Sequence, residues 1–299
     1  MNIGIVGLGL IGGTIAKSLN KHHNISAYDT SSETIEYALA NKIIHKAYDN
    51  VSDFLADNEV IYICLYPKSI INFIFRNKSF FAKDSVLIEI SGIKKHMIEE
   101  IEKLNLDNID VIYTHPVAGS EKVGVFNARE TIFKNANYVI TPVAGNKESN
   151  LTLAKELALE MGFKNISSIT PEAHDDIIAY TSQLTHILSL SLVNSISTDL
   201  DTKKFIGDSY RELTRISIIN EKLWPELFLH NKASLLTKIE AFEAELHKFK
   251  DAIIMNNSNV LEDLMVKSTT IRTGIGRGEN DESWSLPFKG QRYNCSTCI

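Results

Sequence analysis

Three glycines near the N-terminus have the spacing of a phosphate-binding turn. They follow a short apolar run at residues 3–6 and precede a helix-like stretch at residues 14–19. In such a strand–turn–helix unit, the first glycine permits the tight turn and the second lets the backbone approach a pyrophosphate. The third allows close packing, and the helix N-terminus offers N–H groups to the phosphates. We therefore predict a dinucleotide site that includes Gly7, Gly9, Leu10, Ile11 and Gly12.

An acidic residue follows at the distance that this interpretation requires. Residues 25–28 are predicted to form the second strand, and Asp29 comes directly after them. In dinucleotide-binding units, a carboxylate at this place accepts hydrogen bonds from the ribose hydroxyls. It would repel a 2′-phosphate, and no arginine follows immediately, so Asp29 favours NAD over NADP. The alternative is a glycine-rich turn of another α/β protein, in which Asp29 is an ordinary turn residue.

A histidine later in the chain is the candidate for proton transfer. Residues 114–124 have the sequence THPVAGSEKVG and follow the fifth predicted strand. This position places His115 at the carboxyl end of a strand, on the edge of the sheet where a dinucleotide lies. Because the unperturbed pKa of histidine is about 6.5, His115 can serve as a general base. The alternative is a hydrogen-bonded loop histidine without a chemical role.

The elements that position these residues change in kind near residue 145. Before it, apolar runs at 3–6, 25–28, 60–65, 86–90, 111–114 and 138–141 alternate with helical stretches. This alternation predicts an α/β fold with a Rossmann-type, doubly wound parallel sheet. After residue 145, strand signals almost vanish, and helices are predicted at about 148–162, 171–198, 203–219, 221–255 and 257–273. We predict an NAD-binding domain at 1–145, an all-helical domain at 146–273 and an extended or disordered tail at 274–299.

The composition excludes several classes of partner. The 299 residues carry a net charge of −6, which gives no electrostatic reason to expect nucleic acid or an anionic membrane. No apolar run approaches the roughly 20 residues of a membrane span, and no signal peptide is expected. Three cysteines are too few for a disulfide framework, and Cys295 and Cys298 supply only two of the four ligands of a structural zinc site. We expect a cytoplasmic protein without a metal site.

Several segments together resemble the prephenate dehydrogenase family. The segment at 114–124 is similar to the family's HPxAGSExxG motif, and residues 207–216, GDSYRELTRI, are similar to GxxxRDxTRI. Residues 171–175, 181–186 and 223–231 also match family segments in the same order, so that the resemblance covers about residues 1–255. It implies oxidative decarboxylation of prephenate to 4-hydroxyphenylpyruvate, with a hydride passed to NAD. It also implies that the helical domain forms a homodimer.

The resemblance also assigns roles to residues in the helical half. It implies that His115 acts on the C4 hydroxyl of prephenate, that Arg215 holds a substrate carboxylate, and that Arg211 forms a structural ion pair. A guanidinium suits the role of Arg215 because its planar fork matches a carboxylate. His186 matches the second histidine of the family's SHLPH motif, as a polar group at the substrate site or as a buried histidine between helices. The chain departs from that motif at Gln183.

Two further residues are expected near the cofactor and substrate, and two are not. Ser91 follows the predicted strand at 86–90, where the family has small residues near the nicotinamide, and Pro67 ends a strand beside the expected path of the cofactor. His174 and Asp175 are expected to be structural.

Three alternatives remain beside prephenate oxidation. Arogenate, in which an amino group replaces the side-chain ketone, would serve the same chemistry. A β-hydroxyacid dehydrogenase shares the layout, but it usually needs a catalytic lysine on the first interdomain helix, and the sequence has no convincing equivalent. A protein that only senses NAD would have no reason to keep His115 and Arg215 together.

Overall fold

A computed structural model describes residues 1–106, 109–119, 122–196 and 204–275. The chain divides into two compact units, Met1–Lys238 and Ile239–Ile299, and the first of these contains every candidate site residue. Most of the predicted tail, including Cys295 and Cys298, lies outside the described residues. Among the described helices, none is both long enough and apolar enough to cross a membrane.

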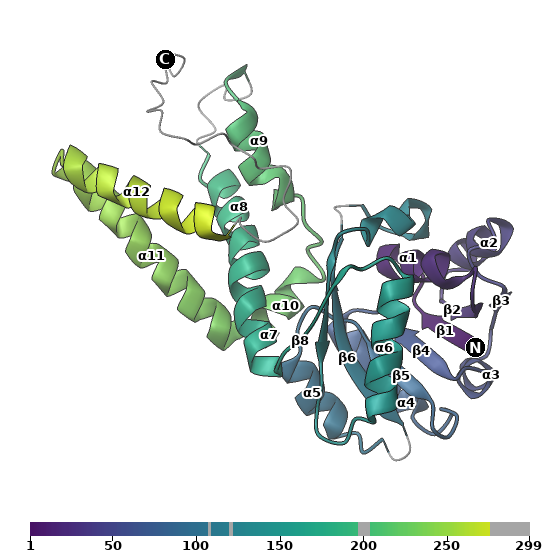
Figure 1. Ribbon diagram of the computed structural model, residues 1–299. Coiled ribbons are helices and arrows are strands. Elements are labelled where there is room, and N and C mark those ends of the chain that lie inside the picture. The colour runs from purple at the N-terminus through teal and green to yellow at the C-terminus, as the bar shows by residue number, and fades with distance from the viewer. Residues whose placement is uncertain (107–108, 120–121, 197–203, 276–299) are drawn as a thin grey trace. The chain divides into compact units, whose positions relative to one another are not determined.

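The first unit is built on one eight-stranded sheet (Figure 1). The strand order is β3-β2-β1-β4-β5-β6-β7-β8, so the direction of winding reverses between β1 and β4. In open α/β sheets, ligands bind outside the carboxyl ends of the strands at such a reversal. The strands are β1 (Asn2–Val6), β2 (Asn24–Tyr28), β3 (Lys46–Ala47), β4 (Val60–Ile63), β5 (Val86–Glu89), β6 (Asp110–Val117), β7 (Asn137–Thr141) and β8 (Asn165–Ser168).

The sheet departs from the predicted all-parallel arrangement at one pair of strands. β7 runs antiparallel to β6, whereas the other neighbouring pairs are parallel. Between β6 and β7 the described residues form two 3₁₀ turns, η1 (Val125–Asn127) and η2 (Glu130–Ile132), and no α-helix of the kind that usually returns the chain for a parallel pairing. The doubly wound, Rossmann-type architecture is otherwise confirmed.

The sheet also continues past residue 145. Helix α6 (Glu148–Glu160) leads to β8, which pairs with β7. The expectation that strands end before residue 145 is therefore wrong for this segment. Its sequence, NISS, is short and mostly polar, and three of its four residues are exposed, so no apolar run marks it.

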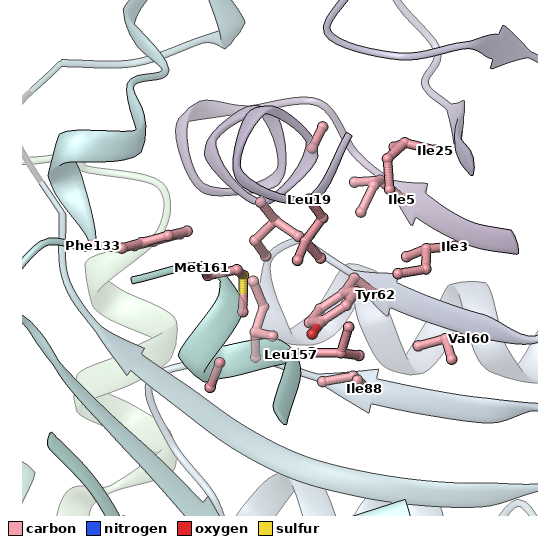
Figure 2. Packing of buried hydrophobic residues seen from close by; sticks show 14 of the residues in the cluster. Ile3, Ile5, Leu19, Ile25, Val60, Tyr62, Ile88, Phe133, Leu157 and Met161 are labelled. Atoms are coloured by element: carbon pink, nitrogen blue, oxygen red, sulfur yellow. The ribbon is translucent and has the colours of Figure 1, made fainter. Parts of the chain in front are cut away.

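Helices cover both faces of the sheet. On one face, α1 (Leu10–Leu19) and α6 pack against strand residues such as Ile5, Tyr62 and Ile88, as Figure 2 shows. On the other face, α3 (Val51–Asp57), α4 (Pro67–Asn77) and α5 (Lys95–Glu102) pack against residues such as Ile61 and Leu87. Because both faces are covered, these strands are apolar throughout rather than alternating. The remaining helix of this part is α2 (Ser32–Ala40).

The helical half follows directly after β8. The predicted stretch at 171–198 is divided by a π-helical turn, Ala179–Leu184. In the described part of the predicted stretch at 203–219, the α-helical segment is short, Asp208–Thr214, and the 3₁₀ turn Arg215–Ser217 follows it. Helix α11 runs across the boundary between the two units. The helices are α7 (Pro171–Ile178), α8 (Thr185–Asn194), α9 (Asp208–Thr214), α10 (Trp224–His230), α11 (Lys232–Ile254) and α12 (Ser258–Ile275).

Candidate active site

The glycine turn after β1 has the geometry that the motif requires. Gly7 has a φ of +87°, which side chains rarely tolerate, and a Cβ at Gly12 would lie 2.0 Å from the carbonyl oxygen of Gly7. A Cβ at Gly9 would meet no heavy atom within 4 Å, so the backbone there is open to a ligand. Leu10 and Ile11 form the start of α1 directly after this turn. The residues therefore fit a bound pyrophosphate.

Asp29 lies beside this turn at the end of β2. Its Oδ2 accepts a hydrogen bond from the N–H of Leu8 at 2.7 Å, and its Oδ1 accepts one from the N–H of Ser31 at 2.9 Å. These bonds fix the carboxylate next to the phosphate-binding turn and leave lone pairs for further donors. Pro67 begins α4 beyond the carboxyl end of β4, on the other side of the reversal in strand order, and it is buried.

His115 lies within β6 and contacts a histidine from the helical half. Its Nδ1 is 2.9 Å from Nε2 of His174 on α7, and the two rings meet edge to face. Nε2 of His115 lies 3.6 Å, and Cε1 3.7 Å, from the position that a Cβ of Gly92 would occupy. Gly92 belongs to the loop after β5. The absence of a side chain at Gly92 therefore leaves room in front of Nε2.

A buried carboxylate stands behind His174. Oδ1 of Asp175 lies 2.7 Å from Nδ1 of His174 and accepts a hydrogen bond from the N–H of Lys94 at 2.8 Å. Its Oδ2 accepts one from the N–H of Lys95 at 2.9 Å. Asp175 therefore satisfies two N–H groups at the start of α5, which have no partner within that helix. The side chains of His115, His174 and Asp175 form one hydrogen-bonded series.

A buried ion pair braces the loop that faces His115. The ammonium group of Lys94 and the carboxylate of Glu89 are both fully buried and in contact. The other oxygen of Glu89 accepts a hydrogen bond from the N–H of Ser91 at 2.5 Å, and the hydroxyl of Ser91 donates to the carbonyl of Ile93 at 2.9 Å. Each of these contacts spans two to five residues, so together they hold the loop in one conformation. Ser91 lies in this loop, next to Gly92.

Helix α10 connects this loop to the other predicted substrate residues. Leu227 lies 3.7 Å from the Cβ position of Gly92, and its carbonyl accepts a hydrogen bond from Gln183 at 3.0 Å. One turn earlier, the ring of Trp224 packs on the ring of His186 with centroids 3.8 Å apart. Nδ1 of His186 donates to the carbonyl of Ser182 at 2.8 Å, because a carbonyl only accepts.

The two arginines of the predicted substrate segment lie in different surroundings. Arg211 forms an exposed ion pair with Asp208, at 2.9 Å. Arg215 lies one turn later, in the 3₁₀ turn after α9, and its positive charge contributes to lowering the pKa of His186. Of the two arginines, Arg215 is therefore the one whose charge acts on a predicted substrate residue.

Burial determines the charge state of the histidines. Burial, with smaller contributions from His174 and Lys94, holds the pKa of His115 well below its usual value. Burial also lowers the pKa of His174, although its hydrogen bond to Asp175 opposes that effect. Burial lowers the pKa of His186 as well. At neutral pH these three rings are uncharged, and each carries one N–H donor and one acceptor nitrogen.

Two residues of this neighbourhood were missed by sequence reasoning. Glu89 and Lys94 appear in the sequence only as an acid at the end of an apolar run and a lysine five residues later. A charged residue that continues a buried strand could have indicated a buried ion pair, since charged residues are almost never fully buried unless paired. Of the two residues expected to be structural, His174 is in hydrogen-bonded contact with the candidate base, and Asp175 is in contact with His174.

The doubly wound sheet, the glycine turn with Asp29, and a neutral histidine at the sheet edge place the chain among the Rossmann-type dehydrogenases. Two family models match the chain. Residues 15–167 match the nucleotide-binding domain of prephenate dehydrogenase, and residues 170–267 match its dimerization domain. The chain therefore belongs to the prephenate dehydrogenase family, whose members are oxidoreductases.

Individual relatives agree with this assignment. The cyclohexadienyl dehydrogenase of Zymomonas mobilis is 24% identical over 282 residues, which cover 92% of this chain and 96% of the relative. The structure of prephenate dehydrogenase from A. aeolicus in complex with hydroxyphenyl propionate and NAD⁺ is similar with a TM-score of 0.84 and 24% identity, covering 92% of this chain and 98% of that one. Synechocystis arogenate dehydrogenase gives a TM-score of 0.78 and 24% identity, covering 92% and 100%. At this identity, the two structures show a shared fold.

Proposed function

We propose that the protein catalyses the NAD-dependent oxidative decarboxylation of prephenate to 4-hydroxyphenylpyruvate. The observation that carries the proposal is the placement of His115. Its Nδ1 is held by His174 at 2.9 Å, and its Nε2 faces the side of the loop where Gly92 leaves room. This is a neutral imidazole at the carboxyl edge of the sheet, on the same edge as the glycine turn.

The chemistry of prephenate fits such a group. Prephenate has a hydroxyl and a hydrogen on C4 of a cyclohexadiene ring, and the hydrogen leaves as a hydride. Positive charge then develops at C4, and the hydroxyl becomes a stronger donor. Neutral His115 accepts that hydrogen bond and the proton as a general base, and it returns the proton to the oxygen once the ring is aromatic. The bond from C1 to its carboxylate then breaks, its electron pair completes the aromatic ring, and CO₂ leaves.

Asp29 and the glycine turn support NAD as the hydride acceptor. The carboxylate is fixed beside the turn by Leu8 and Ser31, in the place where ribose hydroxyls are bound in this fold. A negative charge there disfavours the additional phosphate of NADP. The A. aeolicus relative was solved with NAD⁺, which agrees with this choice. Gly7, Gly9, Leu10, Ile11 and Gly12 would hold the pyrophosphate, with Pro67 along the path of the cofactor.

The anionic substrate is proposed to bind between the β5–α5 loop and the start of α10. Arg215 supplies a permanent positive charge for a carboxylate. His186, held by Ser182 and Trp224, offers a further polar group, and Ser91 lies in the loop beside Gly92. The dimerization-domain match supports a homodimer, and the cytoplasmic location expected from the sequence stays a prediction.

A second substrate is favoured by a specific observation. One structural relative is named arogenate dehydrogenase, and a curated relative is named cyclohexadienyl dehydrogenase. Arogenate differs from prephenate only in the side chain, so the acceptor role of His115 toward the C4 hydroxyl would be unchanged. The reaction at the ring is therefore the same for prephenate and arogenate.

The test is a spectrophotometric assay of NADH formation with prephenate and arogenate side by side, first with NAD and then with NADP. The proposal expects prephenate and NAD to give the highest kcat/KM. A higher kcat/KM with arogenate would assign the second substrate, and no turnover with either compound would refute the proposed function. The His115→Asn variant serves as the control for background reduction.

A further inference from the structure

We propose that His174 and Asp175 are positioning residues that keep the proton of His115 on Nδ1 and leave Nε2 as the acceptor that faces the substrate. The proposal stands on three hydrogen-bonded groups whose donor directions can be assigned. Its kinetic consequence rests on the proposed function. The protonation pattern itself does not, because it follows from contacts within the protein.

The carboxylate of Asp175 determines where His174 carries its hydrogen. Its carboxylate already accepts backbone N–H groups from Lys94 at 2.8 Å and from Lys95 at 2.9 Å. A carboxylate can only accept hydrogen bonds. The third contact, at 2.7 Å from Nδ1 of His174, therefore requires that this nitrogen carry a hydrogen. The backbone donors at the start of α5 thus orient the carboxylate, and the carboxylate fixes the tautomer of His174.

The hydrogen on Nδ1 of His174 then determines which nitrogens donate and accept in the two neutral rings, His174 and His115. His174 is fully buried, and a neutral imidazole has a single N–H. With that hydrogen on Nδ1, Nε2 of His174 is an acceptor, and Nδ1 of His115 at 2.9 Å must donate to it. The remaining nitrogen of His115, Nε2, is then an acceptor. The opposite direction would require either that Asp175 donate a hydrogen to His174 or that His174 carry a hydrogen on both nitrogens, as a cation that its burial disfavours.

Further contacts hold α7, the helix that carries His174 and Asp175, in place. The side-chain amide of Asn231 donates to the carbonyl oxygen of Asp175 at 2.8 Å and to Oε1 of Gln183 at 2.9 Å. Asn231 and Gln183 are both buried. These bonds tie α7 to the residue that follows α10. The position of His174 relative to β6 is therefore set from two sides, by the start of α5 and by the end of α10.

The protonation pattern is tested without substrate. In protein labelled with ¹⁵N in histidine, long-range ¹H–¹⁵N correlation spectra distinguish a protonated ring nitrogen from an unprotonated one, and the signals of His115 are those missing in His115→Asn. We expect a protonated Nδ1 and an unprotonated Nε2 in the wild type, and loss of this pattern in Asp175→Ala, which removes the acceptor. A protonated Nε2 in the wild type would overturn the proposal, as would an unaltered pattern in Asp175→Ala.

The kinetic test uses two substitutions of His174 that differ in hydrogen bonding. In His174→Gln, the amide can donate to Asp175 and accept from His115, as the imidazole does, whereas His174→Phe can do neither. We expect His174→Phe to lower kcat about 10- to 100-fold, by analogy with the range found when orienting partners of metal-bound histidines are removed, and His174→Gln to recover most of it. KM for NAD should change little in both. Asp176→Asn, an exposed neighbour paired with Lys238, is the matched control and should leave kcat unchanged.

The outcomes separate the proposal from the proposed function. Equal losses in His174→Phe and His174→Gln, or none in either, would contradict a positioning role. If His174→Phe does not fold, the spectra of the wild type and of Asp175→Ala decide. If the wild type oxidises neither prephenate nor arogenate, the proposed function fails, while the spectra still test the tautomer of His115.

Discussion

His115 and His174 are 59 positions apart in the sequence, yet Nδ1 of the first lies 2.9 Å from Nε2 of the second. One ring projects from strand β6 and the other from helix α7, so the contact joins the sheet to the helical half at the candidate base. Because Nδ1 is engaged in this way, only Nε2 of His115 can serve a bound substrate. The chemistry assigned to His115 therefore depends on one nitrogen atom.

Removal of this nitrogen should affect the chemical step more than binding. General base catalysis contributes about 10²- to 10⁴-fold, so we predict that His115→Asn lowers kcat for prephenate by at least about 100-fold. The affinity for NAD should be nearly unchanged, because the proposed cofactor site is the glycine turn and Asp29. Steady-state kinetics and NAD titration measure the two effects. Wild-type kcat in the variant would refute the assignment.

The free energy of unfolding should fall in mild acid because His174 is buried in its neutral form. The pKa of His174 is lowered in the folded state, so the unfolded chain binds more protons once the pH falls below about 6.5. The stabilisation is thus fully present above that pH and is lost as the pH falls through the folded pKa. Each such group contributes a slope of up to about 1.4 kcal/mol per pH unit in the free energy of unfolding.

This pH dependence can be measured by urea denaturation between pH 7.5 and 5.5. His174→Gln removes the titrating group, so its free energy of unfolding should fall less steeply than that of the wild type. His22→Gln, a change at an exposed ring, is the control and should keep the wild-type slope. A slope in His174→Gln equal to that of the wild type would show that His174 does not titrate as the structure indicates.

The sequence was sufficient for the parts of the fold that local patterns encode. The turn from Gly7 to Gly12, the acid after β2 and the strand that carries His115 are all specified by short segments, and the structure places them as predicted. β8 was not found, because its exposed, polar residues carry no periodic signal. The antiparallel direction of β7 was also missed, since direction depends on the connection and not on the strand's own residues.

The long-range part of the site could not be predicted in the same way. Asp175 and the N–H of Lys94 are 81 positions apart, and no local pattern connects them. Likewise, the tilted ring contact between His186 and Trp224 joins two helices whose sequences show only ordinary helical periodicity. Family motifs placed His174 and Asp175 next to each other in the sequence. Only the tertiary fold shows that His174 contacts His115 and that Asp175 stands behind it.

Cofactor choice should depend on the carboxylate of Asp29. A hydrogen bond to a charged group contributes about 1.5–3 kcal/mol, so we predict that the wild type prefers NAD over NADP by about 10- to 100-fold in kcat/KM. Asp29→Asn should narrow this preference by raising KM for NAD. Steady-state kinetics with both cofactors test the prediction. Equal or better turnover of the wild type with NADP would show that Asp29 does not select the cofactor.

The chain should form a homodimer through its helical part. Large apolar side chains are exposed there, with Leu213 at 65%, Ile218 at 78% and Leu229 at 70% exposure. Exposed apolar groups of this kind mark association surfaces when they gather in a patch. Sedimentation at micromolar concentration should give about twice the chain mass of 33.5 kDa. Leu229→Glu should weaken the dimer, whereas Phe75→Glu, exposed on α4, should not; a monomeric wild type would contradict the prediction.

Arg215 should hold the substrate by one of its carboxylates. Loss of a charge-assisted hydrogen bond of about 1.5–3 kcal/mol corresponds to roughly one to two decades in affinity. We therefore predict that Arg215→Ala raises KM for prephenate by that amount. KM for NAD should scarcely change, since the anionic groups of the cofactor are proposed to lie on the glycine turn. Initial rates at varied prephenate and at varied NAD measure both values.

Arg211→Ala is the matched control, because it removes the same side chain one helical turn earlier. Arg211 is paired with Asp208 at 2.9 Å on the surface, and exposed ion pairs contribute only about 0–1 kcal/mol to stability. Its removal should therefore slightly lower the free energy of unfolding and should leave KM for prephenate near the wild-type value. If Arg211→Ala instead gave the large increase in KM and Arg215→Ala did not, the two roles would be reversed. The alignment of this segment with the family motif would then be wrong.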